Sequence, residues 1–303
     1  MLRDCIVTAV ELVENYQPEG QDTKLTRNFI PEHYFTGIKS LLNLDKDLLI
    51  YCNKSVEEDI TNALKDKVQS LPTFINKTSK DINPFYDEIF EYSKKVIDKN
   101  PTGVYCWSPM LTTAKLFYIL DAISLKYERV VWMDAGLSNE SYIPEECGGT
   151  WHDIKVQNWD NYYPKNENDI FNPTLGKNIF KLFEKTNNFM IGLPYVGIEP
   201  ELFIEKFWDR KIDYWSASAG LLGLTVRKAH SIKQMYIGAL KYYLSEYDRI
   251  FTEIELFTFL NVYFNFAKLT FANFNPTKEK GSIYDLLKNK INYDEIRFSN
   301  INL

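Results

Sequence analysis

The sequence lacks the marks of several large classes of protein. No apolar run approaches the ~18 residues that a membrane span requires, and no signal peptide is recognisable. The four cysteines, Cys5, Cys52, Cys106 and Cys147, form no C-x-x-C pair and have no zinc-ligand spacing. Three of them lie in apolar stretches, where free cysteine behaves as a small hydrophobic residue. We therefore expect reduced thiols, no transmembrane segment and a cytoplasmic protein.

The chain also lacks an excess of positive charge. Lysine and arginine total 35 against 41 acidic residues, the formal net charge is -6, and no block of basic residues occurs. A general nucleic-acid binder would carry a basic patch, so nucleic acid is not an expected partner. A small phosphorylated ligand stays compatible with this composition.

What is present is the composition and periodicity of an α/β protein. The chain has 303 residues, 45% of them hydrophobic and 25% charged, which is enough for a large core without a metal or disulfide. The first part predicts strands at 5–13 and 47–51 and helices at 31–44 and 56–68. This alternation favours parallel strands with right-handed crossovers. The predicted fold is α/β, with a central, mostly parallel sheet flanked by helices.

The later part of the chain continues the alternation. Helices are expected at 84–97, 111–125, 178–184, 199–208 and 227–245, and strands at 154–157, 189–196, 213–224 and 266–275. Residues from 276 onward are polar and predict a tail. No linker separates independent domains, so we expect one domain over 1–303, in which 1–137 is a nucleotide-binding half, 138–275 an acceptor-binding half and 276–303 the tail.

The stretch 128–137 is the centre of this pattern. Residues 129–133 form an apolar run typical of a buried strand, and the run ends in Asp134, Ala135 and Gly136. An acid at the end of a buried strand costs free energy unless it is paired. Ligands of open α/β sheets bind outside the carboxyl ends of the strands. Asp134 is therefore a candidate ligand-facing residue, and an ordinary Asp-Ala-Gly turn is the alternative.

Four stretches together resemble a known family. They are Ile6-Val7-Thr8-Ala9, the segment 34–51, the segment 115–136 with Val131-Trp132-Met133-Asp134-Ala135-Gly136, and Gly220-Leu-Leu-Gly223 followed by Thr252-Glu253. With these stretches the chain resembles a GT-A glycosyltransferase, and more specifically the bacterial HtrL/YibB-like family. The resemblance covers most of residues 5–265 and implies a Rossmann-like GT-A fold that transfers sugar from a nucleotide-sugar donor.

The resemblance also implies roles on the donor side. In GT-A enzymes an acid that ends a central strand holds a divalent cation, Mn²⁺ or Mg²⁺, on the donor diphosphate, and Asp134 matches that acid. The usual motif has a second acid two residues later, where this chain has Gly136. One carboxylate with waters and phosphates still holds Mg²⁺, whereas a metal-independent enzyme would use basic residues such as Lys115 or Lys54. The remaining donor-site candidates are Thr8 and Asn53, at the ends of the first two predicted strands.

On the acceptor side the resemblance points to a late acid. An inverting transfer needs a base near the acceptor hydroxyl, and Glu253 matches the family's position for it, with Glu255 as the alternate. Acids in a first helical turn also occur simply because they complement the helix dipole. The candidates for acceptor contacts are His152, Trp215 and Gly220, the last because small residues in a strand allow close approach.

The function expected from these residues is transfer of a sugar, from a UDP-sugar in the first instance, to a hydroxyl of a glycan or other acceptor. Two alternatives stay open. The fold could serve a catalytically inactive module that binds nucleotide-sugars or glycans. A nucleotidyltransferase is the other, but it would need a Gly-rich basic loop near the first strand, and residues 8–28 contain one glycine.

Overall fold

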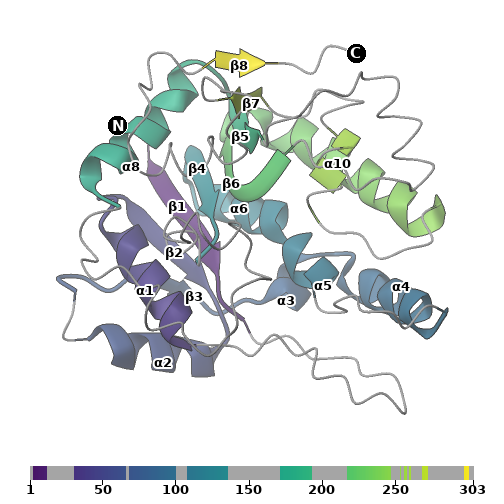
Figure 1. The fold of residues 1–303 in the computed structure, drawn as a ribbon, viewed down its shortest axis with the longest axis horizontal. Coiled ribbons are helices and arrows are strands. Elements are labelled where there is room, and N and C mark those ends of the chain that lie inside the picture. The colour runs from purple at the N-terminus through teal and green to yellow at the C-terminus, as the bar shows by residue number, and fades with distance from the viewer. Residues whose placement is uncertain are drawn as a thin grey trace, which may run out of the picture.

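The fold was determined as a computed structural model that describes residues 3–11, 31–65, 68–99, 108–135, 171–192, 217–246, 268–271 and 297–299, and the single positions 253, 256, 257, 259 and 260. The strands are β1 (Asp4–Ala9), β2 (Asp47–Tyr51), β3 (Thr73–Ile75), β4 (Arg129–Met133), β5 (Asn188–Gly192), β6 (Ala217–Thr225), β7 (Lys268–Phe271) and β8 (Arg297–Ser299). The helices are α1 (Pro31–Leu42), α2 (Lys54–Leu64), α3 (Ser79–Ile82), α4 (Tyr86–Lys99), α5 (Ser108–Thr112), α6 (Lys115–Ser124), α8 (Pro173–Lys181), the 3-10 turn η3 (Leu182–Glu184) and α10 (Val226–Glu246). Figure 1 shows their arrangement.

All the described strands belong to one mixed sheet. Their order is β3-β2-β1-β4-β6-β5-β7-β8. The first four are mutually parallel, β6 runs antiparallel to both β4 and β5, and β8 is antiparallel to β7. The parallel core confirms the predicted α/β class.

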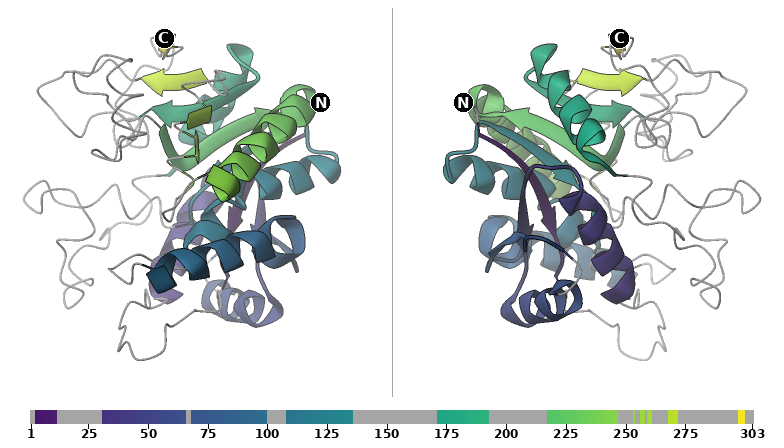
Figure 2. Two further views of the ribbon diagram at one scale, coloured as in Figure 1. Left: turned by 90° about the vertical axis from the view of Figure 1, so that its right-hand side faces the viewer. Right: turned by 90° about the vertical axis from the view of Figure 1, so that its left-hand side faces the viewer.

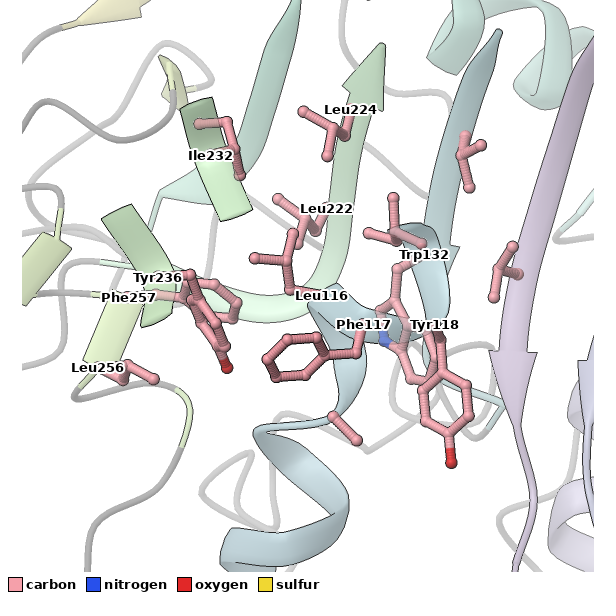
Figure 3. Packing of buried hydrophobic residues seen from close by; sticks show 14 of the residues in the cluster. Leu116, Phe117, Tyr118, Trp132, Leu222, Leu224, Ile232, Tyr236, Leu256 and Phe257 are labelled. Carbon is pink, nitrogen blue, oxygen red and sulfur yellow. The ribbon is translucent and has the colours of Figure 1, made fainter. Parts of the chain in front are cut away.

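Helices cover both faces of the sheet. One buried cluster joins β1, β2 and β4 to α4, α6 and α10, and the other joins the opposite face of the same strands to α1, α2 and α8. Figure 2 shows α4 and α10 in front of the sheet in one view, and α1 and α8 in front in the opposite view. Figure 3 shows the first cluster, where Phe117 and Tyr118 from α6 lie beside Trp132 of β4. The alternation of side chains along the strands produces these two cores.

The prediction of one helix over 111–125 is wrong, because the structure has two helices there. The chain breaks between α5 and α6 at Thr113, whose carbonyl accepts a hydrogen bond from the Tyr236 hydroxyl at 2.8 Å. A side chain inserted into the helical hydrogen-bond pattern is a known cause of kinks. The break makes Lys115 the first residue of α6.

Of the other predicted helices and strands, some are confirmed and some lie outside the described residues. The strand at 47–51 is confirmed as β2, and the helix at 227–245 is confirmed within one residue of each end. The predicted polar tail, residues 276–303, also contributes a strand to the sheet, because β8 pairs antiparallel with β7 at the sheet edge. The elements predicted at 154–157 and 199–208 lie outside the described residues. Among the helices that are described, each is too short or too polar to cross a membrane.

Gly223 has a packing role in this sheet. It pairs with Val131 on β4, and its missing side chain leaves room for the ring of Phe189 from β5. A Cβ at this position would lie 2.3 Å from the ring atom Cε1 of Phe189. The close approach that small residues allow in this strand is therefore used, at Gly223, by an aromatic side chain.

We expect Gly223→Ala to lower the free energy of unfolding by about 1–3 kcal/mol, the usual range for overpacking a core. Gly238 on α10 is the matched control, because a Cβ there meets nothing within 4 Å. Gly238→Ala should stabilise the protein by up to about 1 kcal/mol through helix propensity. Urea denaturation of both variants measures these changes, and equal effects of the two substitutions would contradict this packing role.

Candidate active site

The strand order creates one position where a ligand site is expected. From β1 the chain moves to β2 and β3 on one side, and then returns to place β4 on the other side of β1. Ligands of open α/β sheets bind at such a switch point, outside the carboxyl ends of the strands. Glu11 follows β1 and Asp134 follows β4, so both lie at the carboxyl ends of the two flanking strands.

Three of the residues predicted from the sequence meet at the end of β4. The Lys115 ammonium contacts both oxygens of Asp134, with Nζ–Oδ1 at 2.9 Å and Nζ–Oδ2 at 3.0 Å. The same ammonium contacts Oε1 of Glu253 at 2.8 Å, across 138 positions of sequence. The structure therefore places one cation between the two carboxylates that the sequence singled out.

The three side chains of this group differ in how much solvent reaches them. Side-chain exposure is 8% for Lys115 and 7% for Glu253, against 33% for Asp134. Burial by itself lowers the pKa of Lys115, but the nearby charges of Asp134 and Glu253 outweigh burial and raise it above the ordinary value. Lys115 therefore stays charged at neutral pH, and Asp134 is the member of the group that solvent reaches most.

Neighbouring groups fix the orientation of Asp134. The Trp132 indole donates to Asp134 Oδ1 at 2.6 Å, and the Asp134 amide donates to the Gly220 carbonyl at 3.0 Å. Trp132 in turn stacks on Tyr118, with ring centroids 5.6 Å apart (Figure 3). Gly220, predicted as an acceptor contact, thus supports Asp134 through its backbone. Trp132 was missed in the sequence, although residues two apart on a strand share a face.

Lys115 itself occupies an unfavourable local position. A cation in the first turn of a helix opposes the helix dipole, and burial of an ammonium adds a desolvation cost. Asp134 and Glu253 offset both costs by direct contact. Lys115 is therefore a buried, paired cation rather than a solvated surface lysine.

The residues around Asp134 allow a test of the implied divalent cation. The described residues contain no group of three possible His, Cys, Asp or Glu ligands, so they form no all-protein metal cage. Mg²⁺ at nucleotide sites, however, is held by one or two carboxylates together with phosphates and water. Lys115 neutralises one of the two carboxylates, which leaves a net charge of about -1 and an accessible Asp134. The group fits the single-carboxylate mode of binding.

The remaining donor candidates lie elsewhere. Thr8 is fully buried, and strand alternation places it on the face of Ile6, opposite to the face of Trp132. Its hydroxyl has no hydrogen-bond partner among the described residues. Asn53 is the N-cap of α2, where its Oδ1 accepts from the Val56 amide at 3.0 Å. Four further candidates, Gly136, His152, Trp215 and Glu255, lie outside the described residues.

Glu11 is a half-buried acid at the switch point that the sequence did not reveal. It accepts hydrogen bonds from the Ser79 amide at 2.8 Å and the Ser79 hydroxyl at 3.0 Å, and from the Tyr118 hydroxyl. Burial raises its pKa, while these hydrogen bonds lower it by a smaller amount. Tyr118 thus links Glu11 to Trp132 and so to Asp134.

The raised pKa of Glu11 predicts a pH-dependent stability. The native protein holds this proton to higher pH than the unfolded chain, so the contribution of Glu11 is favourable below about pH 4.3 and declines as pH rises toward the native pKa. Glu11→Gln stays neutral and keeps an acceptor for Ser79, so it should gain stability over the natural protein as pH rises. Urea unfolding at several pH values measures the difference, with the exposed Glu58→Gln as control. Parallel curves would contradict the prediction.

Comparisons with known proteins find similarity among solved structures. No family model matches the chain, so the finer resemblance to the HtrL/YibB-like family receives no support from that comparison. No curated protein matches it either. Among solved structures, the chain is similar to mouse xyloside xylosyltransferase 1 in its apo form, with a TM-score of 0.42 and 9% sequence identity over 88% of this chain and 83% of that one.

Proposed function

We propose that the protein is a glycosyltransferase that transfers a sugar from a nucleotide-sugar, a UDP-sugar in the first instance, to a hydroxyl of a glycan or other acceptor. The observation that carries the proposal is the meeting of Lys115, Asp134 and Glu253 at the carboxyl end of β4, beside the switch point. A buried lysine held between a buried and a partly exposed carboxylate is costly to desolvate, and this one lies at the edge of the sheet where ligands bind. The GT-A resemblance of the sequence agrees with this location.

Asp134 is the donor-side residue in this proposal. Its carboxylate is the most accessible of the three, and Lys115 and Trp132 hold it in one orientation. Asp134 would hold a divalent cation, which when bound neutralises charge that develops on the leaving diphosphate. Lys115 supplies a positive charge beside Asp134 and so lowers the repulsion between this end of the sheet and an anionic donor.

Glu253 has two possible roles in the transfer, and they differ in what they require. A general base must reach the acceptor hydroxyl directly or through one water. A positioning residue only needs to hold Lys115, which Glu253 does at 2.8 Å with a side chain that is 7% exposed. The contact with Lys115 favours the positioning role, and the base assignment stays a prediction.

The test of the proposed function is a thermal-shift screen with nucleoside diphosphates and nucleotide-sugars, with and without Mn²⁺. A ligand at a hundred times its Kd stabilises the native state by about 2.7 kcal/mol, which such a screen detects. We expect a shift with one nucleoside diphosphate and its sugar conjugates, and a smaller shift for Asp134→Asn. No shift with any of them would refute a nucleotide-sugar site.

A binding module without activity is the second candidate, since position 136 is glycine rather than a second acid. Donor hydrolysis separates the two functions, because a transferase slowly transfers its sugar to water when no acceptor is present. Release of the nucleoside diphosphate from the stabilising sugar conjugate supports the enzyme. Stabilisation without any release supports the binding module.

A further inference from the structure

Four exposed cations gather at the end of the sheet opposite to the candidate active site. They are Arg3, just before β1, Lys126, just after α6, and Arg227 and Lys228 in the first turn of α10. Figure 2 shows the N-terminus beside the amino-terminal end of α10. We call these four residues, together with Leu125 and Val226, the basic patch.

Hydrogen bonds join the separate segments of the basic patch. The Arg3 guanidinium donates to the Leu125 carbonyl at 3.4 Å, and the Arg3 carbonyl accepts from the Glu128 amide at 2.9 Å. The Glu128 carbonyl accepts from the Val226 amide, also at 2.9 Å. Residues 3, 125–128 and 226 therefore form one continuous surface at the amino ends of β1 and β4.

Two features of the basic patch, a backbone conformation and a pair of residue types, lower the stability of the fold. Lys126 has a positive φ of 72°, a conformation at a helix end that glycine adopts at much lower cost. Arg227 and Lys228 stand in the first turn of α10, where the helix dipole favours acids and no acid is present. Departures from local preference concentrate where function requires them. The cations are therefore better explained by a partner than by the fold.

The basic patch has little internal compensation. Lys126, Arg227 and Lys228 form no ion pair with another residue in the part of the chain that the structure describes, and Arg3 lies over the Tyr127 ring at 4.3 Å. Of the acids next to the patch in sequence, Glu128 is half-buried and Asp4 is paired with Lys46 and Arg129. Although the whole chain carries a net charge of -6, these four exposed cations would attract an anionic surface to this end of the sheet.

Two aliphatic side chains define the kind of anionic surface. Leu125 is 40% exposed and Val226 is 48% exposed, and both stand among the four cations. Exposed apolar groups surrounded by lysine and arginine suit the interface of a bilayer, where cations meet headgroups and apolar side chains enter the acyl boundary. We propose that the basic patch docks the protein onto an anionic phospholipid membrane. The candidate site then faces away from the bilayer, because Asp134 lies at the carboxyl end of β4.

The test is co-sedimentation with vesicles of phosphatidylcholine, with and without phosphatidylglycerol. We expect the protein to bind only the anionic vesicles, and more weakly as salt rises. Neutralising three cations in the variant K126Q/R227Q/K228Q should lower the partition coefficient by about a hundredfold, at about fivefold for each cation lost. The control K95Q/K177Q/K241Q removes three exposed lysines elsewhere and should keep the natural binding.

Two further variants separate docking from general charge attraction. L125S/V226S should weaken binding at high salt, where the apolar contribution dominates. Lys126→Gly should raise the thermal stability of the protein while weakening vesicle binding, a combination that a purely structural lysine would not show. Nucleotide-induced thermal shifts should be unaffected by all of these variants, so this proposal and the proposed function fail independently.

Three results would overturn membrane docking. Equal binding to neutral and anionic vesicles would show that the cations do not drive binding. Equal losses of binding in the patch and control variants would show that the protein does not dock through the basic patch. Tighter binding to a single-stranded RNA oligomer than to anionic vesicles, lost in K126Q/R227Q/K228Q, would assign the basic patch to nucleic acid instead.

Discussion

Asp134→Asn is expected to lower sugar transfer by about a hundredfold or more, the scale on which loss of one preorganised electrostatic group acts, while the fold survives. The amide keeps the shape of the carboxylate and an oxygen for the Trp132 indole, which donates to Asp134 at 2.6 Å. Lys115 keeps Glu253 as its partner, so no buried charge is left unpaired. Steady-state transfer measured with the donor that emerges from the thermal-shift screen, together with the melting temperature, checks both parts.

Asp121→Asn is the matched control for this substitution. Asp121 is also a partly buried aspartate with a lysine partner, Lys77 at 2.7 Å, but it lies within α6 and accepts a hydrogen bond from Tyr51. Transfer should stay close to that of the natural protein in this control. Full activity of Asp134→Asn, or an equal loss in both variants, would show that Asp134 is an ordinary turn residue.

Lys115→Met is expected to lower the free energy of unfolding by about 3–5 kcal/mol, because removal of one partner leaves an uncompensated buried charge. Methionine fills the volume of the lysine stem but supplies no cation to Glu253, whose side chain is 7% exposed. The double variant K115M/E253Q should recover most of the loss, since it contains no unpaired buried carboxylate. Urea denaturation of the two single variants and the double variant gives the coupling energy.

Lys77→Met provides the contrast for Lys115→Met. Lys77 contacts Asp121 at a similar distance, but its side chain is 43% exposed. An exposed pair contributes at most about 1 kcal/mol, so Lys77→Met should be mild. If Lys115→Met cost the same with Glu253 and with glutamine at position 253, the two groups would not be coupled.

Glu253→Gln separates the two roles of the inner carboxylate. A base loses turnover by about a hundredfold or more when its carboxylate becomes an amide, with donor affinity preserved. A residue that only holds Lys115 keeps an acceptor oxygen in glutamine and loses much less. The ratio of kcat to donor affinity in this one variant decides between them.

The sequence determined the local features of this protein. The apolar run before Asp134 predicts a buried strand that ends in an acid, and β4 ends where that pattern ends. The alternation of strands and helices predicts an α/β sheet, because the hydrophobic period of a segment depends only on neighbouring residues. Candidate status for Lys115, Asp134 and Glu253 also came from the chain itself, through their types and their resemblance to a family.

The tertiary structure decided which of these residues act together. Glu253 is 138 positions from Lys115. Their charges come within 2.8 Å because Leu256, Phe257, Phe259 and Leu260 pack into the same core as α6 and α10. The break at Thr113 depends likewise on a hydroxyl from α10. The basic patch also depends on the tertiary structure. The sequence has no basic block, and the fold brings four cations from three segments to one end of the sheet. Long-range contacts depend on the whole fold, so no local pattern in the sequence encodes them.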